Sequence, residues 1–188
     1  MSAFEFLFSF YGLLLGLALT EVIGGLSRAL NERATRPIGW LIPLLAILLT
    51  LDLMTFWASA WIDLKDITFS TRLLLFASVS PMIYYFAAKQ AFPDSDSAAA
   101  SLDDHFYAHR VWVIGGVILA NQLSYLPVID EPGMWSRFFS NVIYVGPLAV
   151  AAFVRPKWLI ILILVAEIGW LLSLMSGLLA HVALWPGA

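Results

Sequence analysis

The chain has 188 residues, of which 61% are apolar and only 12% are charged, and its mean hydropathy is +0.87. Soluble domains carry about 25% charged residues, so this composition predicts a polytopic membrane protein whose main partner is the lipid bilayer. The net charge of −3 without a basic cluster argues against nucleic-acid binding, and the lack of cysteine excludes disulfides and thiolate metal sites.

Six segments are long and apolar enough to cross a membrane, which requires about 17 to 25 residues. They cover residues 6–26, 39–62, 69–92, 106–126, 138–154 and 158–180. Pro81 interrupts the third segment and Pro147 the fifth, so kinks are expected in both. The expected fold is an all-α membrane helix bundle with about six transmembrane helices in a single domain, residues 1–188. Five spans remain possible because the fifth segment is short.

Lysine and arginine are distributed unequally between the two ends of the expected bundle. One end has Arg28, Arg33, Arg36, Lys89, Arg110, Arg155 and Lys157, and the other has Lys65, Arg72 and Arg137. Because basic residues are enriched on the cytoplasmic side, this bias places the first, third and fifth connections in the cytoplasm. The sequence therefore predicts a multi-pass protein of the cell inner membrane with both termini in the periplasm.

The first segment carries small residues at every fourth position, namely Gly12, Gly16, Thr20 and Gly24. Small side chains let another helix approach the backbone closely. The stripe predicts helix packing inside the chain, in a homo-oligomer or with a partner membrane protein, and the sequence leaves these open. The tetrapeptide VIGG, at residues 22–25 and 113–116, places a further Gly-Gly pair near the cytoplasmic end of two segments, where helices can cross closely.

Three acidic residues lie inside apolar segments: Glu21 in the first, Asp52 in the second and Glu167 in the sixth. Each costs about 2.5 to 3.5 kcal/mol at the membrane centre, so each is expected to face protein or water. Their overlapping depths suggest a polar interior shared by three helices. The functional interpretation is a site for a proton or cation, and the structural one is a set of hydrogen-bonded acids that join helices.

Other polar side chains accompany these acids. Thr55 and Ser59 extend a polar stripe from Asp52 along the same helix face, since residues three and four apart are neighbours. Asn121 and Gln122 make the outer part of the fourth segment polar, and they could bind a solute or bond across helices. Glu167 has no polar neighbour on its own helix, so its partner is expected on another span.

The stretch "DDHFYAHR", residues 103–110, places His105 and His109 four residues apart, on one face of a helix. This spacing suits two ligands of zinc or a similar metal, with Asp104 as a candidate third. The alternative is ordinary interfacial polarity at a helix start. Ser101 followed by Asp104 also resembles a capping box that opens the fourth helix.

No GxSxG, P-loop or dinucleotide motif occurs, so an enzyme is not expected, and no cofactor is predicted. The stretches "FSFYGLLLGLALTEVIGGLSRAL", "LLTLDLMTFW" and "LDDHFYAHRVWV" resemble small bacterial polytopic inner-membrane proteins of unknown function. They cover about a quarter of the chain, and the resemblance implies no activity and no site residues.

The leading hypothesis is an inner-membrane bundle that handles a proton, a small cation or a small solute. Its polar interior would be lined by Glu21, Asp52 and Glu167. One alternative is a non-catalytic accessory or scaffold subunit that binds partner helices through the first segment. Another is a metal-binding or sensory membrane protein centred on His105 and His109.

Overall fold

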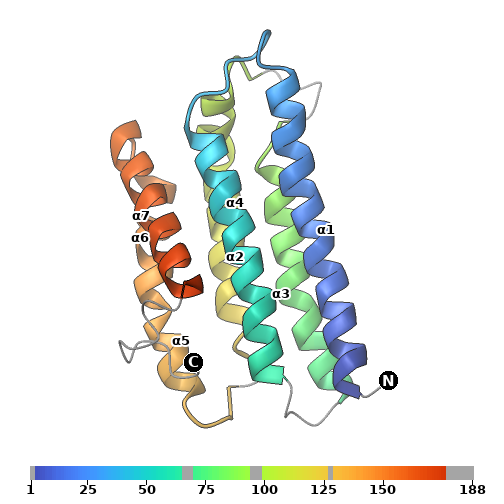
Figure 1. The fold of residues 1–188 in the computed structure, drawn as a ribbon. Helices are drawn as coiled ribbons and strands as arrows, with labels where there is room; N and C mark the ends of the chain where they lie inside the picture. Colours follow the sequence, from blue (N-terminus) through green and yellow to red (C-terminus); the bar gives the residue numbers. More distant parts are fainter. Residues whose placement is uncertain (1–2, 65–69, 94–98, 127–128, 177–188) are drawn as a thin grey trace.

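The computed structural model describes residues 3–64, 70–93, 99–126 and 129–176. Within these ranges the chain forms seven α-helices and no strand, as Figure 1 shows, so the predicted all-α class is confirmed. The helices are α1 (Ala3–Asn31), α2 (Leu41–Leu64), α3 (Thr71–Gln90), α4 (Leu102–Leu123), α5 (Met134–Ser140), α6 (Val142–Phe153) and α7 (Lys157–Met175).

The long helices run up and down along one common direction (Figure 1). Helix α1 packs against α2 and α3, and α3 also packs against α4. Helices α6 and α7 pack against each other and cover α4 and α2, respectively. Helices α2 and α4 therefore lie between two outer pairs, and side chains from five helices can meet around them.

Four stretches are long and apolar enough to cross a membrane: Phe4–Asn31, Leu41–Trp61, Met134–Phe153 and Lys157–Met175. Large apolar side chains also face outward, among them Phe86, Trp112 and Phe153, which are at least 70% exposed. Water disfavours such a surface, whereas lipid accepts it. These features fit a polytopic membrane protein. Helices α3 and α4 have the length of a span but are on average less apolar than α1, α2, α6 and α7.

The fifth predicted segment differs most from the structure. In place of one helix over residues 138–154, two helices, α5 and α6, meet at Asn141. The Asn141 side chain donates a hydrogen bond from Nδ2 to the Tyr125 hydroxyl, at 3.0 Å. Because α5 begins at Met134, the two helices together supply the length of a span. The last four residues of the predicted sixth segment, 177–180, lie outside the described residues.

Local sequence signals explain where two of the helices begin. The predicted N-cap is confirmed, because Ser101 Oγ accepts from the Asp104 amide at 3.1 Å. The Asp104 carboxylate accepts from the Ser101 hydroxyl, at 2.6 Å, rather than from the Ser101 amide as in a capping box. Before α2, Gly39 has φ of +65°, which glycine adopts at little cost. A side chain at Gly39 would also collide with the carboxylate of Asp103.

Close helix contacts occur at the Gly-Gly pairs. Gly25 lies against the ring of Phe92, and a Cβ on Gly116 would lie 2.8 Å from the Cβ of Ala87 in α3. The sequence predicted close contacts at these two pairs. In the structure, the first pair contacts Phe92, just after α3, and the second contacts Ala87 within α3.

The small-residue stripe of α1 is not a packing face in the described part of the chain. The α1 residues buried in the bundle include Leu7, Tyr11, Leu15, Ala18 and Val22. Of the stripe, Gly12 faces the indole of Trp57, Gly24 faces Arg28 of its own helix, and Gly16 has no atom within 4 Å of a Cβ position. Thr20 is exposed and donates to the Gly16 carbonyl, at 2.8 Å. The stripe thus lies beside the buried face rather than on it.

Candidate functional site

Five helices each place one polar side chain in a shared region of the bundle interior. The residues are Asp52 on α2, Tyr84 on α3, Asn121 on α4, Tyr144 on α6 and Glu167 on α7, and we call this set the polar centre. Each of the five is more than nine-tenths buried. A buried polar group without a partner costs about 1 to 3 kcal/mol, so the contacts among the five decide what the centre can do.

A hydrogen bond between helices holds Asp52. Asn121 donates from Nδ2 to Asp52 Oδ2 at 3.1 Å and to the carbonyl of Val117 at the same distance. The bond to Asp52 links α2 to α4, and the bond to Val117 fixes the orientation of the amide. Both Asp52 and Asn121 were predicted as members of a polar site, and the structure brings them into contact.

Two tyrosines also face the Asp52 carboxyl. Tyr84 donates its hydroxyl hydrogen to the carbonyl of Leu49, at 3.2 Å. The Tyr144 hydroxyl, by contrast, makes no hydrogen bond of normal geometry with any described residue. The sequence analysis missed both tyrosines, because a tyrosine within or near an apolar segment is most often an interfacial residue.

Glu167 completes the polar centre from α7. Its carboxyl interacts electrostatically with Asp52 and with Tyr144. It is hydrogen-bonded to none of the described residues. The predicted bond to a partner on another span is not seen among the described residues, although Asp52 and Tyr144 lie on other helices. Asp52 and Glu167 are like-charged when both are ionised, so each disfavours the ionised form of the other.

Glu21 lies outside the polar centre, contrary to the prediction of one interior shared by three acids. Its carboxylate is 3.8 Å from Arg28 and 3.5 Å from the hydroxyl of Tyr85. The physical reason is rotation about α1: the neighbouring Val22 is buried, and one residue along a helix turns the side chain by about 100°. Glu21 therefore belongs to a partly exposed surface between α1 and α3.

The remaining polar residues of the predicted site flank the centre. Thr55 donates its hydroxyl hydrogen to the carbonyl of Asp52 at 2.8 Å, so its hydroxyl is hydrogen-bonded within its own helix. Ser59 is half-buried one turn further along α2. Gln122, next to Asn121, is half-buried, and its buried Oε1 has no hydrogen-bond partner among the described residues.

The histidine pair does not form the predicted metal site. The rings of His105 and His109 stack with centroids 4.0 Å apart. His105 Nε2 bonds the carbonyl of Gln90, and His109 Nδ1 bonds the carbonyl of His105, both at 3.1 Å. The Asp104 carboxylate accepts from Ser101 instead. In the described part of the chain, no three His, Cys, Asp or Glu side chains are grouped so as to hold a metal ion.

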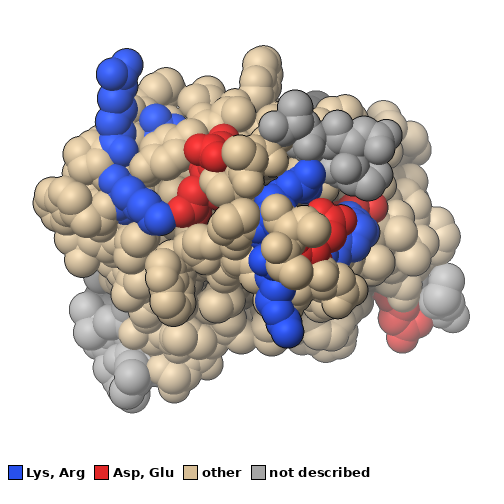
Figure 2. Space-filling view, turned by 90° about the horizontal axis from the view of Figure 1, so that it is seen from above, with Lys and Arg blue, Asp and Glu red and all other residues tan. Residues whose placement is uncertain are grey.

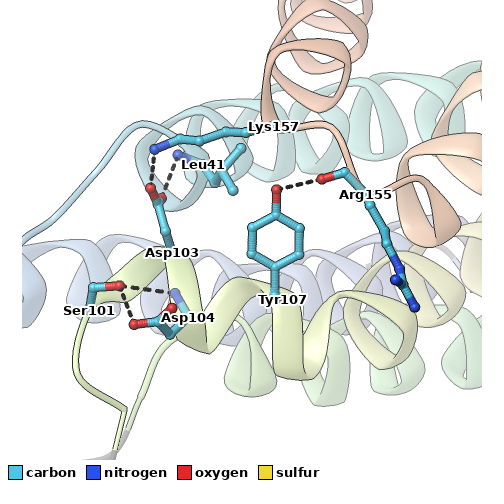
Figure 3. A network of polar contacts seen from close by, with 7 residues as sticks. All are labelled: Leu41, Ser101, Asp103, Asp104, Tyr107, Arg155 and Lys157. Carbon is cyan, nitrogen blue, oxygen red and sulfur yellow. Dashed lines mark hydrogen bonds and ion pairs between the residues drawn. The ribbon is translucent and has the colours of Figure 1, made fainter.

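A second set of polar contacts joins helix ends at the predicted cytoplasmic side (Figure 3). Asp103, in the first turn of α4, pairs with Lys157 and accepts a hydrogen bond from the backbone amide of Leu41, at 3.3 Å. Tyr107, one turn further, donates to the carbonyl of Arg155 at 3.0 Å. The start of α4 is thereby tied to the start of α2 and to the turn before α7.

Arg110 extends this set of contacts into the bundle. Its guanidinium is buried against the last turn of α6, where it donates to the carbonyls of Ala151 and Val154. It also lies 4.8 Å from the centre of the Tyr107 ring. The sequence analysis treated Arg110 only as an end charge, so this role was missed. Together we call Asp103, Tyr107, Arg110 and Lys157 the end network.

Figure 2 looks down on this end of the bundle, where basic and acidic side chains lie next to one another on an otherwise uncharged face. Among them, Arg36 pairs with Glu32 at 3.3 Å one helical turn away. Arg28 with Glu21 and Lys157 with Asp103 are further pairs.

No protein-family model matches this chain, and no curated protein or solved structure matches it either. The fold and the site define it as an all-helical chain with a buried polar centre.

Proposed function

We propose that the chain crosses a bacterial inner membrane six times and passes protons or small cations through the polar centre. The geometry of α3 and α4 supports six spans. With 20 and 22 residues at about 1.5 Å each, they match the roughly 30 Å of a bilayer core. They also lie side by side with α1 and α2 over their length (Figure 1), so all four would occupy the same slab.

The proposed orientation has the end network in the cytoplasm and both termini in the periplasm. The excess of lysine and arginine at the end shown in Figure 2 supports this choice, because basic residues near span ends stay on the cytoplasmic side. Labelling of single cysteines would test it, since the chain has no cysteine of its own. A cysteine at Arg33 should react only from the cytoplasmic side.

One observation carries the proposed function: Asp52 and Glu167 are buried together among uncharged partners. Among the described residues, no Lys, Arg or His interacts with either carboxyl. Asp52 has uncharged donors such as Asn121 but no cation, and Glu167 has neither among the described residues. Acids placed in this way inside a membrane span are the ones that mark ion or proton pathways.

Flux through proteoliposomes tests the proposal. The purified chain is reconstituted, and proton movement is followed with a trapped pH dye while potassium and sodium are followed with ion-selective dyes. Asp52→Asn and Glu167→Gln should each lower the flux seen with the wild type by about tenfold or more. Glu21→Gln is the matched control, because Glu21 lies outside the polar centre. Equal flux in all four proteins, or none in the wild type, would contradict the proposal.

A scaffold role is the second candidate, and the exposure of the α1 stripe favours it. Gly16 and Thr20 are exposed, and nothing lies within 4 Å of the Gly16 Cβ position. A partner helix could therefore approach α1 closely there. Purification in a mild detergent with a Gly16→Cys cross-link would show a homodimer or a stoichiometric partner. A monomer that forms no cross-link would rule out this role.

A further inference from the structure

The Tyr144 hydroxyl lies beside the Asp52 carboxyl in a contact that falls short of normal hydrogen-bond geometry. Its side chain is more than nine-tenths buried. The hydroxyl also interacts electrostatically with Glu167. Leaving a buried hydroxyl unsatisfied costs about 1 to 3 kcal/mol, so a phenylalanine would serve packing better at this position.

We propose that the Tyr144 hydroxyl relays a proton between Glu167 and Asp52, so that the species handled by the polar centre is the proton. This inference rests on the function proposed above and specifies its substrate.

The relay needs only groups that are present. The Tyr144 O–H bond breaks as its proton passes to the Asp52 carboxylate, and the Tyr144 oxygen takes a new proton from the Glu167 carboxylic acid. The phenol is restored, Glu167 becomes a carboxylate and Asp52 becomes the acid. Glu167 approaches by rotating its flexible side chain, which no hydrogen bond with a described residue restrains.

The neighbouring groups assign the relay to Tyr144 rather than to Tyr84. Tyr84 already donates its hydrogen to the carbonyl of Leu49, which has no proton to exchange. Asn121 holds Asp52 Oδ2 and is itself held by the carbonyl of Val117, so it positions the acceptor without taking part in proton transfer. Tyr144 is left as the hydroxyl that is free to change partners.

Size and ligand chemistry favour a proton over a larger species. Metal cations such as calcium take six to eight oxygen ligands and magnesium six, and no group of three acidic or histidine side chains exists in the described part of the chain. A solute would have to displace side chains that are each more than nine-tenths buried. A proton moves along hydrogen bonds and displaces none of them.

The test compares Tyr144→Phe with Tyr107→Phe in the proteoliposome assay. Both changes remove a single hydroxyl, but Tyr107 lies in the end network and bonds the carbonyl of Arg155. Tyr144→Phe should lower proton flux by about tenfold or more, in the range expected for loss of a proton-transfer group, and Tyr107→Phe should leave it unchanged. Melting temperature in detergent reports whether each variant is folded.

Infrared difference spectroscopy supplies a readout that a purely structural role would not change. In the wild type, Glu167→Gln should alter the titration of the Asp52 carboxyl band, because the two carboxyls share a proton. In the Tyr144→Phe background the same substitution should alter it much less. If Tyr144→Phe does not fold, 3-fluorotyrosine at position 144 keeps the shape and makes the phenol more acidic, and the pH profile of flux should then shift.

The outcomes separate the two proposals. Proton flux that is equal in wild type and Tyr144→Phe, with an unchanged pH profile for fluorotyrosine, would overturn the relay while leaving the proposed function intact. Flux of sodium or potassium without protons would also overturn the relay. Absence of all flux in the wild type would overturn the proposed function itself.

Discussion

The end network and the polar centre contain similar side chains, but the hydrogen bonds of the polar centre are less complete. Asp103 is paired with Lys157 and also accepts from the Leu41 amide, and Arg110 donates to two carbonyls of α6. In the polar centre, Asp52 and Glu167 have no cationic partner among the described residues. The Tyr144 hydroxyl there makes no hydrogen bond of normal geometry with a described residue.

The end network and the polar centre thus differ in how completely their polar side chains are hydrogen-bonded. Polar groups that hold helices together are stabilising only when their hydrogen bonds are complete. The end network meets this condition and ties α4 to three other segments. The polar centre meets it only in part, because Asn121 and Tyr84 are hydrogen-bonded whereas Glu167 has no such bond in the described residues.

Asp52→Asn should give the largest functional effect and a small structural one. The amide can still accept from Asn121 but cannot take up a proton, so proton flux should fall by about tenfold or more, which corresponds to about 1.4 kcal/mol or more in the barrier. Reversible unfolding in SDS and detergent mixtures should show stability equal to the wild type or higher. A large loss of stability would show that the polar centre is a structural joint like the end network.

Arg110→Met should give the opposite result, a large structural effect and a small functional one. The change leaves the carbonyls of Ala151 and Val154 without their charged donor, and hydrogen bonds to charged groups contribute about 1.5 to 3 kcal/mol. The same unfolding assay measures this loss. Tyr107→Phe is the milder control, and unchanged stability in Arg110→Met would show that the end network does not hold the bundle.

Gly116→Ala tests whether the centre depends on how closely α3 and α4 approach. The new methyl group would lie 2.8 Å from the Cβ of Ala87, so α3 must shift, at a cost of about 1 to 3 kcal/mol. Gly16→Ala makes the same chemical change where nothing lies within 4 Å, and it should gain about 0.5 to 1 kcal/mol from helix propensity. Equal unfolding free energies for the two variants would contradict the close contact.

Asp103→Asn should produce the smallest effect. Lys157 has a side chain that is 46% exposed, so screening by solvent and salt leaves this ion pair only a small contribution to stability. Unfolding measured at low and high salt should show that salt weakens the wild type toward the variant. Asp52→Asn, which removes no ion pair, should show no such dependence on salt. A salt-independent difference for Asp103→Asn would assign its effect to the Leu41 hydrogen bond alone.

The long helices could be predicted from hydropathy, because a run of apolar residues is visible in the sequence itself. The broken fifth segment was missed because Asn141 is one polar residue in an apolar stretch, and only its bond to Tyr125 shows why the helix changes there. The acids at positions 52 and 167 could be named from the sequence, since a carboxyl inside an apolar segment is conspicuous.

What the sequence could not supply is the rotation of each helix about its axis. Glu21 and Val22 are neighbours in the chain, yet only Val22 is buried. Asn121 and Gln122 look equivalent in the sequence, yet only Asn121 reaches Asp52. Tyr84 and Tyr144 belong to the centre for the same reason: their helices are turned so that both hydroxyls face one carboxyl.

The bond from the Leu41 amide to Asp103 spans 62 residues of sequence. A ribosome makes Leu41 well before it makes Asp103, so α2 enters the membrane with its first amides still unpaired. Gly39 keeps the space that the later carboxylate occupies. The hydrogen bonds at the start of α2 are therefore complete only once α4 has been synthesised and has docked against it.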